Sequence, residues 1–385
     1  MVKMTRMPSH VETVVTILRQ GRGNGRPVGD CLADVDWESA LEFANQEMVT
    51  PELHAAINAA GLGGRLPPDV GAYLAYIHDL NRTRNERMRE QLIELIKVWN
   101  DAGLVPFVLK SGVALFTEIE AMLSRMVTDL DFLFDPSEIE GAVRAAESLG
   151  YRPAVDHEDG GEHAYMYLGR AGGPALLDLH RQLLSMSHLL PATELRRRAI
   201  PRRCDDAYAL VPSKEDQLLH RVLHDMVHQS GHRGGTISLR GLTDFARLVN
   251  ANASLDWDAI VSSLERHGAQ NVLRAQAYAA RELLGVEVPP TIAGGPAARF
   301  YYWRGVERWR RHGADIEPAL LRLFLSGLAY RWDPAARMVP FPAKLVRRVF
   351  YGWERAPVEP PIGSASARWL RFSRRKSAKP TVQRH

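Results

Sequence analysis

The sequence has 385 residues, of which 45% are hydrophobic and 24% are charged. These are ordinary values for a globular protein, and they exclude a disordered or collagen-like chain. The formal net charge is +4, but residues 364–385 contain seven Lys and Arg and no Asp or Glu. Residues 1–363 therefore carry 4 − 7 = −3, so the overall charge is no argument for nucleic-acid binding.

The two cysteines, Cys31 and Cys204, have no metal-ligand spacing and cannot form a disulfide framework. A reducing cytoplasm is therefore the expected location. The first residues lack the apolar segment and small-residue cleavage site of a secretory signal peptide. No run of 18 apolar residues occurs, so we expect no stable membrane insertion. The sequence does not indicate an oligomeric state.

Residues 1–34 are expected to form a flexible segment, because they end in the polar, glycine-rich run GRGNGRPVGD. From Trp37 onward apolar residues recur with the helical period, and residues 35–103 are predicted to form a helical N-terminal region. Its last part, residues 70–103, is predicted to be one long helix or two. Gly103 is the expected C-terminal cap.

Strand-like and helical patterns alternate between residues 104 and 212. The predicted strands are VPFVLK (105–110), TDLDFLFD (128–135), HAYMYLG (163–169) and PALLDLHRQL (174–183), and the predicted helices are 111–123 and 137–149. This order implies a small mixed sheet. The predicted fold class is therefore α+β, with a small mixed-sheet domain flanked by helical N-terminal and C-terminal regions.

Residues 213–355 are predicted to form a helical C-terminal domain, and residues 356–385 a linker with a basic tail. Aromatic and basic residues alternate at 300–313 and in the tail, a composition that can contact nucleic acid or membranes. We expect a packed helix at 300–313. For the tail we expect disorder, with a weak contact to anions as the alternative.

The pattern richest in chemistry is Asp129-Leu130-Asp131. Two residues apart on a strand, the two carboxylates point the same way and can share a divalent cation, Mg²⁺ or alternatively Mn²⁺. Asp178 lies in another predicted strand. If the strands are adjacent, three carboxylates could hold two metal ions, and one could accept a proton from an incoming hydroxyl.

A strand-to-helix junction upstream carries Lys110, Ser111 and Gly112. Small residues there let the backbone approach a phosphate, and the helix N-terminus offers free N–H groups. Arg125 lies four residues before Asp129 and could reach a triphosphate. A helix cap at Ser111, and structural ion pairs of Lys110 and Arg125, would give the same pattern.

Several histidines accompany these residues. His180 follows Asp178 by two positions, so it could contact nucleotide, orient a carboxylate or simply be structural. His220, His224 and His228 recur every four residues, but they span about 12 Å along a helix, too far for one ion. We expect this stripe to form an interface, with His224 a candidate to support the site.

Arg240 and Asp244 are four residues apart on a predicted helix. This spacing favours a local ion pair over catalysis. They remain candidates to support the site from outside the metal-binding residues.

In their order and spacing these motifs resemble the nucleotidyltransferase superfamily. More narrowly they resemble an uncharacterised bacterial nucleotidyltransferase family with LKG, R…DxD and third-carboxylate motifs, and they are similar to toxin-type nucleotidyltransferases with LKGGTAL. The matching pieces, over roughly residues 35–250, are LKSGVAL (109–115), SRMVTDLDFLF (124–134), SLGYRP (148–153), LLDLHRQL (176–183) and the helical segments 212–229 and 239–249.

The resemblance implies Mg²⁺-dependent transfer of a nucleoside monophosphate from a nucleoside triphosphate, such as ATP, to an acceptor hydroxyl with release of pyrophosphate. The acceptor could be RNA, protein, peptide or a small molecule. The implied metal ligands are Asp129, Asp131 and Asp178. The resemblance also implies nucleotide contacts by Lys110, Ser111, Gly112 and Arg125, and it adds His180 as a neighbour of the nucleotide.

Two other hypotheses stay open. The chain could be a catalytically degenerate transferase fold that acts as a binding or accessory protein. Alternatively, His224-Asp225 and Asp244 echo an HD-type metal phosphohydrolase, although that class expects its first histidine far upstream. The HD hypothesis also leaves the Asp129/Asp131 strand unexplained.

Overall fold

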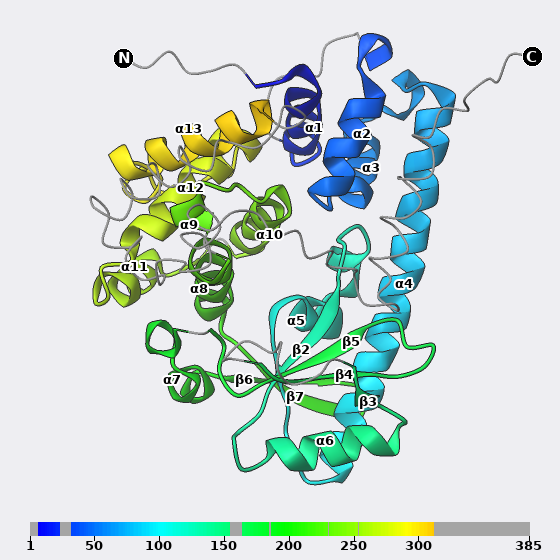
Figure 1. Cartoon of the computed structure of the whole chain (residues 1–385), viewed down its shortest axis with the longest axis vertical. Coiled ribbons are helices and arrows are strands. Elements are labelled where there is room, and N and C mark those ends of the chain that lie inside the picture. Colours follow the sequence, from blue (N-terminus) through cyan, green and yellow to red (C-terminus); the bar gives the residue numbers. More distant parts are fainter. Residues whose placement is uncertain are drawn as a thin grey trace, which may run out of the picture. The chain divides into compact units, whose positions relative to one another are not determined.

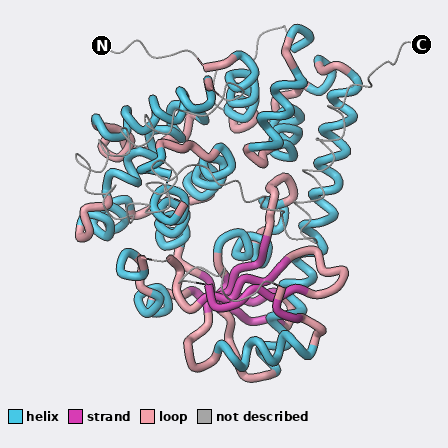
Figure 2. Tube along the Cα trace, in the orientation of Figure 1, coloured by secondary structure: helices cyan, strands magenta, loops and turns pink. Residues whose placement is uncertain are grey.

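The computed structural model describes residues 7–23, 32–154, 164–184, 186–229, 231–252 and 254–311. They lie in one compact unit of the chain, residues 1–340. The fold is α+β, as predicted (Figure 2). The expected linker and basic tail lie outside the described residues.

The N-terminal region is helical and leads into one very long helix (Figure 1). Its elements are α1 (Ser9–Gln20), η1 (Leu32–Asp34), α2 (Trp37–Gln46), α3 (Thr50–Ala59), η2 (Gly63–Arg65) and α4 (Pro68–Asp101). Of the two possibilities, this stretch thus forms one helix, which ends at Asp101. Proline at its first position and Gly103 at φ 75° just beyond its last are the expected terminal residues.

The prediction that residues 1–34 are flexible is wrong for helix α1. This helix buries five apolar residues against the helical core, Val11, Val14, Val15, Ile17 and Leu18. Their spacing of three and four residues makes one continuous apolar face. The glycine-rich run that suggested flexibility begins only after the helix ends at Gln20.

The central region forms a seven-stranded mixed sheet with the order β3-β4-β5-β2-β1-β7-β6. Its elements are β1 (Phe107–Val108), α5 (Lys110–Thr117), η3 (Ile119–Met122), β2 (Asp129–Leu133), α6 (Ile139–Ser148), β3 (Arg152–Pro153), β4 (Ala164–Gly169), β5 (Leu176–His180), η5 (Ser187–Leu189), α7 (Ala192–Arg197), β6 (Ile200–Cys204) and β7 (Ala207–Val211). Strand β2 pairs in parallel with β5 and antiparallel with β1.

The two faces of β2 have opposite character. Leu130 and Phe132 are fully buried in an apolar cluster with α4, α5 and α6. Asp129 and Asp131 alternate with them and face the other way. On β5, Leu177 likewise enters the apolar cluster. The alternation therefore collects the carboxylates of neighbouring strands on one face of the sheet.

Helix α4 holds the sheet through polar bonds as well as apolar contacts. Trp99 packs edge-on against Phe132, with ring centroids 4.6 Å apart, and its Nε1 donates to the carbonyl of Ala142 at 2.9 Å. Gln91 is buried and bonds both backbone groups of Ala175, just before β5, at 3.0 and 3.1 Å. Gln91 thereby fixes the start of the strand that carries Asp178.

A second helical region follows the sheet. Its elements are α8 (Lys214–Leu223), the π-helical turn η6 (His224–His228), α9 (Gly231–Gly234), α10 (Leu239–Asn250), α11 (Trp257–Glu265), α12 (Gln270–Leu284) and α13 (Pro296–Arg310). Helix α13 covers most of the expected helix at 300–313, and it buries Tyr301 and Trp309 in the helical core.

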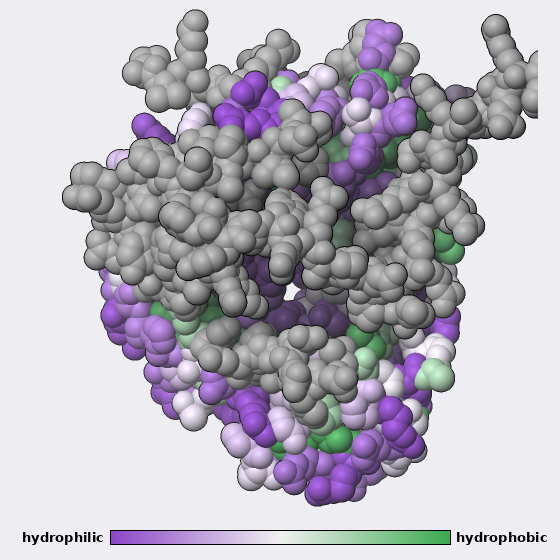
Figure 3. Space-filling view, viewed as in Figure 1, coloured by the Kyte–Doolittle hydropathy of each residue, from purple (hydrophilic) through white to green (hydrophobic). Residues whose placement is uncertain are grey.

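The described atoms on the face shown in Figure 3 are mainly hydrophilic over α6, with hydrophobic residues scattered between them. The most exposed large hydrophobic side chain among the described residues is Tyr76 on α4, at 62%. Within the described ranges no helix is both long and apolar enough to cross a membrane.

We expect Gln91→Met to lower the free energy of unfolding by about 2 to 3 kcal/mol, because the N–H and carbonyl of Ala175 would be left buried without partners. Urea denaturation monitored by circular dichroism measures the change. Glu90→Met, at the adjacent exposed position, places the same side chain in solvent and should change stability by less than about 0.5 kcal/mol. An equal effect of the two substitutions would contradict this role of Gln91.

Candidate active site

Two buried carboxylates lie opposite each other on neighbouring strands. The parallel register of β2 and β5 pairs Asp131 with Asp178, and their relative exposures are 2% and 3%. Like charges buried this close repel strongly unless cations compensate them. The site must therefore contain positive groups.

Lys110 and His180 supply this positive charge. Nζ of Lys110 lies 2.5 Å from Oδ1 of Asp131. Nε2 of His180 lies 3.0 Å from the same oxygen and 3.1 Å from Oδ2 of Asp178. Burial alone would raise the pKa of Asp131, but Lys110 and His180 hold it well below its usual value. Burial alone would lower the pKa of His180, but both carboxylates raise it.

Lys110 begins α5, directly after β1, and its backbone conformation is unusual. Lys110 has φ 47°, a left-handed conformation that costs a non-glycine residue about 1 kcal/mol or more. Gly112 is required for packing, because a Cβ there would lie 2.8 Å from Cγ1 of Val108. The sequence motif is thus explained in part by close packing of α5 on β1.

Asp129 lies at the start of β2, next to the buried cluster. It accepts a hydrogen bond from Oγ1 of Thr128 at 2.7 Å. Burial and the negative charge of Asp131 raise the pKa of Asp129. Arg84 of α4 bonds the backbone carbonyl of Val127, so a cation stands beside this carboxylate.

Asp131, Asp178 and His180 form the group of potential metal ligands found in the described ranges, with ligand atoms within 4.8 Å of one another. Oδ1 of Asp178 is buried and has no hydrogen-bond partner among the described residues. Carboxylate oxygens suit a hard divalent cation, and an unpartnered buried oxygen is costly unless something binds it. These residues could therefore hold a divalent metal ion.

Arg125 forms the kind of structural ion pair that was the alternative to a triphosphate contact. It is buried, and its Nε and Nη2 donate to Asp244 of α10 at 2.6 and 2.7 Å. Asp244 also pairs with Arg221 at 3.1 Å and Arg247 at 3.3 Å. Among the described residues, Asp244 forms ion pairs with these three arginines and not with Arg240. Nη1 of Arg240 lies 3.5 Å from Sδ of Met48 instead.

The histidine stripe is divided between two helical forms. His220 lies within α8, whereas His224 and His228 lie in the π-helical turn. Asp225, the acid expected in an HD-type site, pairs with Arg221, and Oδ2 accepts from Gln276 at 3.2 Å. Both acids that the phosphohydrolase hypothesis needs as metal ligands are therefore paired with arginines.

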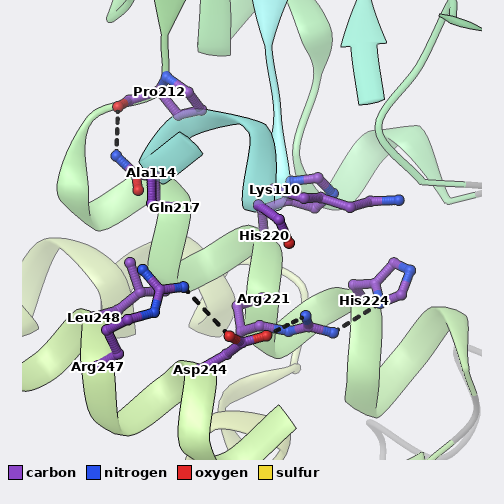
Figure 4. Close-up of a pocket in the computed structure, with 11 residues that line it drawn as sticks. Lys110, Ala114, Pro212, Gln217, His220, Arg221, His224, Asp244, Arg247 and Leu248 are labelled. Atoms are coloured by element: carbon purple, nitrogen blue, oxygen red, sulfur yellow. Dashed lines mark hydrogen bonds and ion pairs between the residues drawn. The ribbon is translucent and has the colours of Figure 1, made fainter. Parts of the chain in front are cut away.

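Lys110 and Ser111 line a cavity of about 40 Å³ together with residues of α8 and α10 (Figure 4). The α8 and α10 residues drawn there include His220, Arg221 and Arg247. Neither Arg221 nor Arg247 was among the site residues expected from the sequence. Their spacing on amphipathic helices is that of surface residues, and only the tertiary structure brings them beside Lys110.

The sequence of the chain matches a model of the uncharacterised nucleotidyltransferase family over residues 33–285, about two thirds of its length. The chain belongs to this family. Among curated proteins, no sequence matches it. The family assignment agrees with the resemblance to nucleotidyltransferases inferred from the motifs, and the matched region contains the whole sheet together with helices α2 to α12.

Asp244→Asn should lower the free energy of unfolding at pH 7 by about 3 to 5 kcal/mol, because it leaves buried arginines without their counter-charge. Burial opposes ionisation of Asp244, but Arg125 lowers its pKa below the unfolded value of 3.8. The stabilisation is therefore present above pH 4 and is lost as the pH falls below it.

The difference between wild type and Asp244→Asn should therefore shrink below pH 4, by up to about 1.4 kcal/mol per pH unit. Urea denaturation at pH 7 and pH 3 measures it. Asp79→Asn, at a side chain that is 64% exposed, is the matched control and should have little effect at either pH. A gap that widens on acidification would contradict the assignment.

Proposed function

We propose that this chain is a Mg²⁺-dependent enzyme that transfers a nucleoside monophosphate from a nucleoside triphosphate to an acceptor hydroxyl and releases pyrophosphate. The observation that carries the proposal is the pairing of Asp131 and Asp178 across β2 and β5, with Lys110 at the start of α5 beside them. Membership of the nucleotidyltransferase family supports the same reaction class.

Asp131 and Asp178 would hold the metal ion, and Asp129 would complete the set of carboxylates. All three bear hard oxygen donors, and Asp178 keeps a buried oxygen without a partner among the described residues. A bound Mg²⁺ would supply charge neutralisation for the phosphates during transfer. His180 lies within hydrogen-bond distance of both carboxylates, so we assign it the role of orienting them.

The phosphates would lie at the N-terminus of α5. Ser111 and Gly112 form the first turn of this helix, where the helix dipole favours an anion. The N–H of Gly112 donates to the carbonyl of Leu109 at 3.0 Å, so it is not a free donor. Lys110 carries the nearest ammonium group. We do not assign Arg125 to the phosphates, because it is buried against Asp244 and does not line the cavity beside Lys110.

The reaction then follows from these positions. The acceptor oxygen forms a bond to the α-phosphorus, and the bond between that phosphorus and the bridging oxygen to the β-phosphate breaks. Pyrophosphate leaves with the electron pair of the broken bond. The hydroxyl proton passes to a carboxylate, for which we propose Asp178. The protein contributes mainly positioning and preorganised charge.

We expect the purified protein, given labelled nucleoside triphosphates, Mg²⁺ and a cell extract, to label one acceptor class. Mass analysis identifies whether that class is RNA, protein, peptide or small molecule. Asp131→Asn and Asp178→Asn should each lower the rate by about a hundredfold or more, because they remove charge from the reacting centre.

Asp206→Asn is the matched control, since its side chain is 96% exposed, and it should keep full activity. Failure of all four nucleoside triphosphates with both Mg²⁺ and Mn²⁺ would overturn the proposed function. Full activity of Asp131→Asn would overturn the assignment of the site.

A further inference from the structure

The cavity beside Lys110 is lined from two sides. Lys110, Ser111 and Ala114 come from α5. Helices α8 and α10 contribute Arg221, Arg247 and His220, together with the carboxylate of Asp244 (Figure 4). The helical region thus places charged groups beside the junction where the proposed function puts the triphosphate.

The described ion pairs beside this cavity contain more arginines than carboxylates. Arg125, Arg221 and Arg247 share the carboxylate of Asp244, and Arg221 also pairs with Asp225. Three arginines against two carboxylates leave 3 − 2 = +1. Guanidinium groups out of bulk water need counter-charge, so this excess calls for an anion.

Further charges surround these ion pairs. Arg22 and Arg240 add two guanidinium groups, and Glu47, Glu52 and Asp129 add three carboxylates that act on arginines of the cluster. Burial and neighbouring positive charge lower the pKa of both Arg22 and Arg240.

His220 also lines this cavity and contributes a buried ring nitrogen. Its exposure is 3%, and its Nε2 is buried with no hydrogen-bond partner among the described residues. Burial, together with the positive charge of Lys110, lowers the pKa of His220 well below its usual value, so the ring is neutral and can donate one hydrogen bond. Such an atom is costly to bury unless a ligand completes it.

We propose that this cavity is a subsite for a phosphoryl group of a substrate, bound by the guanidinium groups of Arg221 and Arg247 and by His220. The inference rests on the proposed function, because it adds a binding site to the same reaction. Guanidinium forks match phosphate oxygens in geometry, and the first turn of α5 at Ser111 faces the same space. The phosphoryl group belongs either to the terminal phosphates of the nucleotide or to a phosphorylated acceptor.

Isothermal titration of the full chain with pyrophosphate tests the proposal. Wild type should bind pyrophosphate, and Arg247→Gln should weaken binding about tenfold or more, the effect of losing a charged hydrogen bond. Arg247→Lys should lose less, because it keeps the charge. Arg144→Gln, at a side chain that is 71% exposed, is the matched control and should bind like wild type. Circular dichroism verifies that each variant is folded.

A competition experiment shows whether the bound phosphoryl group belongs to the nucleotide or to the acceptor. If a non-hydrolysable nucleoside triphosphate analogue displaces pyrophosphate, the subsite holds the nucleotide's terminal phosphates. If both bind at once, it holds a phosphate of the acceptor. Absence of pyrophosphate binding, or equal affinity of Arg247→Gln and Arg144→Gln, would overturn the subsite.

These outcomes are separable from failure of the proposed function. A chain that binds pyrophosphate through Arg247 but transfers no nucleotide would keep the subsite and lose the function. A chain that transfers nucleotide with Arg247→Gln unchanged in pyrophosphate affinity would keep the function and lose the subsite.

Discussion

The structure around the site depends on balancing two carboxylates that the sheet forces together. Once β2 and β5 pair in parallel register, Asp131 and Asp178 face each other away from water. Lys110 and His180 neutralise them at hydrogen-bond distance, and the backbone at Lys110 is left-handed. Strain at one residue is tolerated because the surrounding ion pairs stabilise it.

A second charged centre ties the flanking helices to this sheet. Asp244 of α10 receives Arg125 from the segment before β2 and Arg221 from α8. Because this carboxylate is almost fully buried, the interaction is strong but requires all its partners. It fixes α8 and α10 over the N-terminus of α5 (Figure 1), and the cavity results from that position.

Much of this was predictable from local pattern. The alternation of Asp129, Leu130 and Asp131 predicted both the strand and its polar face, and the family motifs pointed to Asp178. The partner of Arg125 was not predictable, because Asp244 lies 119 positions away and Arg240 offers a nearer alternative. The β6–β7 hairpin was not predicted, because its turn, Asp205-Asp206, lacks the glycine that is typical of two-residue hairpin turns, although Asp205 adopts φ 50°.

The central claim is that Asp131 and Asp178 are brought together to hold a metal ion for nucleotidyl transfer. The most direct measurement is anomalous diffraction from crystals of the protein grown with Mn²⁺ and a non-hydrolysable nucleoside triphosphate analogue. The account predicts an anomalous peak at coordination distance, about 2.0 to 2.4 Å, from oxygens of both aspartates. A nucleotide bound with no peak there, or a peak bound only by other residues, would contradict it.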